Sequence, residues 1–111
     1  MMTQSVRLSS EMIAKYMSNL TNRFYKILPI RENEPETLKD YIGSLLLEMI
    51  GCKSLIAALD NDDRYLTLLS TLEYMKGHNM EIRDVRREVF RCIGVIKKLQ
   101  EKYGMREEAI Q

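Results

Sequence analysis

The chain has 111 residues, of which 45% are hydrophobic and 30% charged, a balance that excludes an intrinsically disordered protein. The length predicts one domain with one hydrophobic core and leaves little room for an elaborate active site. The formal net charge of +1 gives no overall indication of a nucleic-acid or membrane partner.

Hydrophobic periodicity predicts four helices and no strand, so the expected fold is all-α, a compact four-helix bundle. The first predicted helix spans residues 10–28 and ends there because the residue before Pro29 avoids the helical conformation. The second spans residues 35–59 and begins at Pro35, a residue that is tolerated in a first turn. Its apolar arc is broad, so we expect this helix to be the central one of the bundle.

The third predicted helix spans residues 64–76. The acidic run Asp60–Asp63 precedes it and is expected to cap its N-terminus. Gly77 follows it and is expected to end it in the left-handed conformation that glycine adopts easily.

The fourth predicted helix spans residues 82–103 and is expected to stop at Gly104. The residues beyond Gly104 are expected to form a frayed tail. The sequence therefore predicts a single helical domain over residues 1–111, with flexible ends at 1–8 and 105–111.

Residue types that bind metals or catalyse reactions are sparse. The chain has one histidine, His78, and two cysteines, Cys52 and Cys92, whereas a structural zinc site needs four such ligands. The five glycines are isolated from one another, so no phosphate-binding loop is predicted. We therefore expect no metal, no cofactor and no enzymatic activity.

The sequence gives no membrane or secretion signal. Residues 1–10 contain no apolar run of the kind found in signal peptides, and the longest uninterrupted one is Leu45-Leu46-Leu47. Two thiols do not indicate a disulfide framework. The expected location is the cytoplasm, with no membrane partner.

Basic residues gather on one side of the fourth predicted helix, namely Arg83, Arg86, Arg87 and Arg91. A short turn with a glycine joins this helix to the one before it, which is the general shape of a helix-turn-helix. One interpretation is a nucleic-acid or anion-binding site at these arginines. The other is a solvated basic face that pairs with the acidic second helix.

Several apolar side chains fall outside the main stripes of their helices or at a helix end. The candidates for an interface are Tyr25, Leu47, Phe90 and Val95. The eight methionines also suit adaptable contact surfaces. These features predict a homodimer, although a four-helix core could also need the same side chains.

The string from Arg23 to Ile30, the glutamate-rich loop after it and the helix from Tyr41 to Gly51 resemble small uncharacterised helical proteins of Gram-positive phages and mobile elements. The resemblance carries no catalytic signature and implies a role in binding host or phage macromolecules.

The function predicted from the sequence is a non-enzymatic helical interaction protein that self-associates and docks onto another macromolecule, with a protein as the expected partner. One alternative is a small nucleic-acid-binding regulator that uses the four arginines. A second alternative is a phage counter-defence protein that blocks a host effector or sequesters an anionic ligand.

Overall fold

The computed structural model describes residues 2–55 and 62–110, and the side chains within 11–52 and 62–102. Its described elements are all helices, which confirms the all-α prediction. Their bounds are α1 Met2–Tyr25, α2 Ile27–Asn33, α3 Pro35–Leu55, α4 Asp63–Gly77 and α5 Ile82–Ile110.

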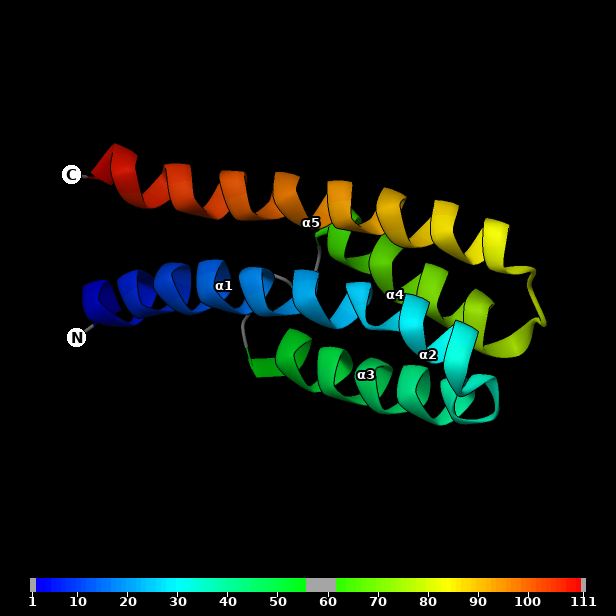
Figure 1. Cartoon of the computed structure of the whole chain (residues 1–111). Coiled ribbons are helices and arrows are strands. Elements are labelled where there is room, and N and C mark those ends of the chain that lie inside the picture. Colours follow the sequence, from blue (N-terminus) through cyan, green and yellow to red (C-terminus); the bar gives the residue numbers. More distant parts are fainter. Residues whose placement is uncertain (1, 56–61, 111) are drawn as a thin grey trace.

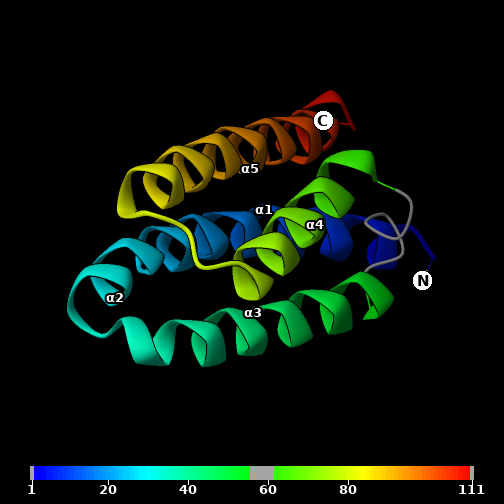
Figure 2. The same ribbon diagram turned by 90° about the vertical axis from the view of Figure 1, so that its right-hand side faces the viewer.

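The four long helices α1, α3, α4 and α5 run side by side as an elongated bundle that measures 46 × 21 × 21 Å (Figure 1). Helix α1 packs most extensively along α5, and α4 packs against both α3 and α5. The short helix α2 turns the chain from α1 into α3 at one end of the bundle (Figure 2). This arrangement supports the predicted four-helix bundle.

The first helix boundary differs from the prediction. Helix α1 ends at Tyr25, and a single turn residue, Lys26, leads into α2, so residues 29–33 are helical and not a loop. Pro29 is the third residue of α2, where a backbone N–H has no partner inside the helix and its absence costs nothing. The prediction that Pro29 ends the helical region was therefore wrong.

The two glycines expected to end helices do not do so in the predicted way. Helix α5 runs through Gly104 to Ile110, because a glycine inside a helix costs only about 1 kcal/mol and does not by itself stop it. Gly77 is the last residue of α4, but among the described glycines none has a positive φ. The chain leaves α4 through His78 in an extended conformation, with φ −128° and ψ 140°.

Two expectations about the chain remain without a test. Residues 56–59 of the second predicted helix lie outside the described residues. The single domain with flexible ends at 1–8 and 105–111 stays a prediction, although α1 begins at Met2 and α5 ends at Ile110.

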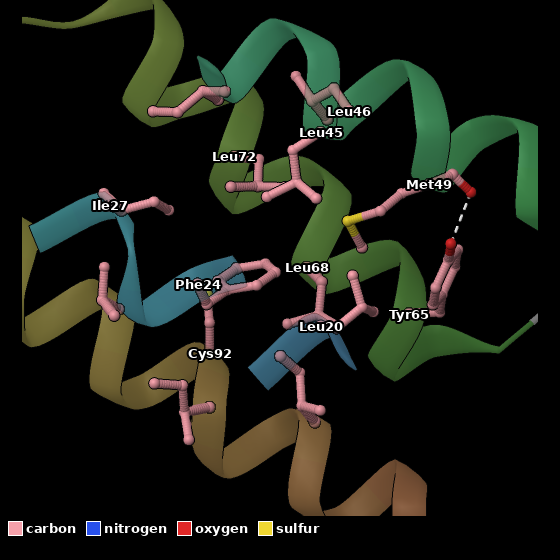
Figure 3. Close-up of a cluster of buried hydrophobic side chains, with 14 of the residues drawn as sticks. Leu20, Phe24, Ile27, Leu45, Leu46, Met49, Tyr65, Leu68, Leu72 and Cys92 are labelled. Atoms are coloured by element: carbon pink, nitrogen blue, oxygen red, sulfur yellow. Dashed lines mark hydrogen bonds between the residues drawn. The ribbon is translucent and has the colours of Figure 1, made fainter. Parts of the chain in front are cut away.

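Helix α3 is an outer helix of the bundle and not its centre. One face of α3 packs against the rest, while Leu47 is 73% exposed and Ile50 is 47% exposed on the other side. The core is instead shared by all four long helices (Figure 3). Its fully buried side chains include Met17, Leu20, Phe24, Ile42, Met49, Tyr65, Leu68, Leu72, Val89, Ile96 and Leu99.

Two tyrosines, one buried and one partly buried, place their hydroxyl groups at this core. The Tyr65 hydroxyl donates a hydrogen bond of 2.5 Å to the backbone carbonyl of Met49, which ties α4 to α3 (Figure 3). The Tyr16 hydroxyl lies 3.5 Å from the Tyr65 oxygen. Burial raises the pKa of Tyr65 to about 12. The pKa of Tyr16 is raised more strongly, mainly by burial and in second place by its hydrogen bond with Tyr65.

The raised tyrosine pKa predicts a loss of stability at alkaline pH. The folded chain holds the Tyr65 proton more tightly than the unfolded chain, whose pKa is the ordinary 10.0. The resulting stabilisation is complete below that pH and is lost as the pH rises towards about 12. Tyr65→Phe should cost about 1 kcal/mol at neutral pH, through the lost hydrogen bond, and should make the alkaline loss smaller.

Urea unfolding followed by circular dichroism, at neutral pH and in steps above pH 10, measures both effects. Tyr74→Phe is the matched control, because Tyr74 is 55% exposed. An alkaline loss of the same size in wild type and in Tyr65→Phe would contradict the prediction.

Candidate functional site

The four arginines predicted as an anion-binding site lie on the exposed side of α5. Each has a carboxylate oxygen within 4 Å, so nearby acids partly offset their positive potential. The pairs and their N–O distances are Arg83–Glu81 at 3.9 Å, Arg86–Glu32 at 3.4 Å, Arg87–Asp84 at 3.3 Å and Arg91–Glu88 at 2.6 Å. These acids belong to α2, to α5 and to the segment before α5, and not to the acidic second predicted helix.

Helices α4 and α5 do not form the steep crossing of a DNA-binding helix-turn-helix. They run antiparallel and side by side, as neighbours in a bundle do (Figures 1 and 2). Helix α5 also packs along α1, so it belongs to the body of the bundle and does not project from it.

The predicted interface residues divide into three separate environments. Tyr25 of α1 and Phe90 of α5 meet edge to face, with ring centroids 5.9 Å apart, and both rings are partly exposed. Leu47 lies on the outer side of α3, away from that pair. Val95 is half-buried and packs against the core, as the alternative interpretation expected for such side chains.

The reactive side chains of the described region lie apart from one another. Cys92 is buried, and this burial raises the pKa of its thiol to about 11, so the thiol is protonated at neutral pH. His78 is exposed, stacks on Tyr74 at 4.0 Å between ring centroids, and places Nδ1 2.8 Å from the Tyr74 carbonyl oxygen. In the part of the chain that the structure describes, no three His, Cys, Asp or Glu side chains gather to hold a metal ion.

A cleft of about 360 Å³ lies at the end of the bundle where α2, the start of α3 and the end of α4 meet. We call it the basic cleft, because Arg31, Lys39 and Lys76 line it and no acidic residue does. Its other lining residues are Pro35, Leu38, Ile42, Met75, Gly77, His78, Asn79, Met80 and Val85. The sequence did not predict this site, since its three cations come from three different helices and form no motif.

A second, wider groove of about 720 Å³ follows α4 and α5, but its charges are mixed. Arg87 and Arg91 line it together with three acids, Glu81, Asp84 and Glu88. The lining of the basic cleft therefore contains cations and no acid, whereas acids offset the cations of the second groove.

None of the helices, over the described residues, has a stretch both long enough and apolar enough to cross a membrane. Comparison of the chain with protein-family models, with curated proteins and with solved structures gives no match.

Proposed function

We propose that this chain is a non-enzymatic helical interaction protein that associates with a second copy of itself through the outer face of α3. The observation that carries the proposal is the 73% exposure of Leu47 in the middle of α3. Ile50, 47% exposed, lies one turn further along the same helix. A leucine and an isoleucine side by side on an exposed helix face favour association, because contact with another copy removes both from water.

Two glycines of α3 also favour this face as the contact surface between copies. Gly43 and Gly51 lie four residues before and after Leu47, and each interior glycine costs about 1 kcal/mol relative to alanine. A Cβ added at Gly51 would meet nothing within 4 Å, and one at Gly43 would meet only the end of the Lys76 side chain at 3.5 Å. Close packing within the described chain therefore explains neither glycine.

The spacing of these residues favours a second copy as the occupant. The sequence positions of Gly43 and Gly51 are symmetric about Leu47. A two-fold axis at Leu47 would place Gly43 of one copy opposite Gly51 of the other, in antiparallel helices whose backbones approach closely.

Leu47→Gln should convert the dimer to a monomer. Because the symmetric contact loses two leucines at once, we expect the dissociation constant to rise about 100-fold or more. Sedimentation equilibrium over a range of micromolar concentrations measures this change. A wild-type protein that is monomeric throughout the range would overturn the proposal.

Met12→Gln is the matched control, because Met12 is 57% exposed on α1 and lies outside the proposed face. Gly51→Ala gives a second measurement that does not depend on disturbing the fold. The added methyl has free space within the monomer and should stabilise α3, so any weaker association must come from contact between copies.

The alternatives from the sequence have less support. A nucleic-acid-binding role for the α5 arginines is weakened by the carboxylate that faces each of them. A phage counter-defence protein that blocks a host effector is supported by the resemblance alone. One that sequesters an anionic ligand has the basic cleft as additional support.

A further inference from the structure

We infer that the basic cleft binds a small phosphate-bearing anion. Its volume of about 360 Å³ falls in the range of ligand pockets in proteins. Buried side chains such as Ile42 and Val85 form an apolar floor, and three cationic side chains also line the cleft.

The cations of the cleft differ from the four arginines of α5 in having no acidic partner among the described residues. Among the described residues, no ion pair involves Arg31, Lys39 or Lys76. The acids that neighbour the lining residues in sequence, Glu34, Glu36 and Asp40, are exposed and do not line the cleft. The positive charge of this site is therefore left for a ligand to neutralise.

Arg31 is held in place before any ligand arrives. Its Nε and Nη2 atoms donate to the backbone carbonyl of Met80, at 3.3 and 2.9 Å, which fixes the half-buried guanidinium against the segment between α4 and α5. A guanidinium has five N–H groups, so about three remain available in a fixed plane. A planar donor of this kind matches the oxygens of a phosphate group.

The number of charges favours a multivalent oxyanion over a single carboxylate. One carboxylate would neutralise only one of the three cations, whereas a diphosphate carries charge enough for all of them. The N-terminus of α3, whose first residue Pro35 lines the cleft, adds to the attraction for an anion. The C-terminus of α4 acts in the opposite sense, and Lys76 in its last turn offsets it.

Isothermal titration calorimetry of the full chain with inorganic pyrophosphate and with ADP tests the inference. Saturable binding of at least one probe is expected. Lys39→Gln combined with Lys76→Gln should weaken it about tenfold or more, because two charge-assisted contacts are lost. Lys97→Gln combined with Lys98→Gln, on the exposed side of α5, is the control that removes the same charge elsewhere.

Tighter binding of ADP than of pyrophosphate would show that the apolar floor contacts the nucleoside. Equal binding would show that the phosphates alone are recognised. Either result supports the inference. Binding of neither probe, or equal weakening by both double variants, would overturn it. Repeating the titration with Leu47→Gln separates this result from the proposed dimer, since the monomer should still bind.

Discussion

Replacing Phe24 with alanine is expected to lower the free energy of unfolding by about 3–5 kcal/mol. Phe24 is fully buried, and its ring lies at the centre of the core, among side chains such as Leu68 and Cys92 from α4 and α5 (Figure 3). Truncation removes apolar contacts and leaves a cavity that the surrounding helices can fill only in part. Since small domains have a total stability of about 5–15 kcal/mol, this loss removes a large share of the free energy of unfolding.

Urea unfolding followed by far-ultraviolet circular dichroism measures the loss. Phe90→Ala is the matched control, because Phe90 is the other phenylalanine of the chain and is 49% exposed. Its loss should stay below about 1.5 kcal/mol, mainly from the edge-to-face contact with Tyr25. Similar losses in the two variants would show that Phe24 does not occupy the centre of the core.

Asp62→Ala is expected to lower the free energy of unfolding by about 2–3 kcal/mol. The Asp62 side chain is only 2% exposed. Its Oδ1 accepts hydrogen bonds from the backbone N–H groups of Arg64 and Tyr65, at 2.9 and 3.3 Å, and thereby caps α4. Its Oδ2 accepts a hydrogen bond of 2.8 Å from Nζ of Lys102 on α5. Alanine removes the cap and the ion pair together.

Two further substitutions divide this effect into its parts. Asp62→Asn keeps an acceptor for the cap and removes the charge, so it should lose less than Asp62→Ala. The ion pair with Lys102 contributes only a modest part of the lost free energy, because the Lys102 side chain is 45% exposed and partly screened by water. Asp63→Ala, at the exposed neighbouring position, should cost under about 1 kcal/mol. Equal losses at positions 62 and 63 would contradict the capping role.

The sequence predicted where helices occur more reliably than where they end. Apolar periodicity identified α3, α4 and most of α1 and α5, because the stripes that form the core have a helical repeat. The capping role of Asp62 within the run Asp60–Asp63 was also predicted correctly. Pro29 and Gly104 misled the prediction, because each is tolerated inside a helix whose other residues favour continuing it.

The surfaces were harder to predict than the core, because their character depends on which side chains meet. A run of arginines is visible in the sequence, but the acids that face them become apparent only in the fold. Arg31 and Lys76 are 45 positions apart, and only the packing of α2 and α4 against the same helix, α3, brings them to one cleft. Leu47 was identified because its helical position lies almost opposite the main apolar face.

The extensive packing of α1 along α5 has a consequence for how the chain reaches its native state. Helix α1 is synthesised before its main partner α5, so much of its apolar stripe stays uncovered until α5 has been made. Contacts between such distant segments form slowly, because a long loop must close before they stabilise anything. The bundle should therefore assemble only once α5 is available, and a truncation that removes α5 should expose the stripe of α1 to aggregation.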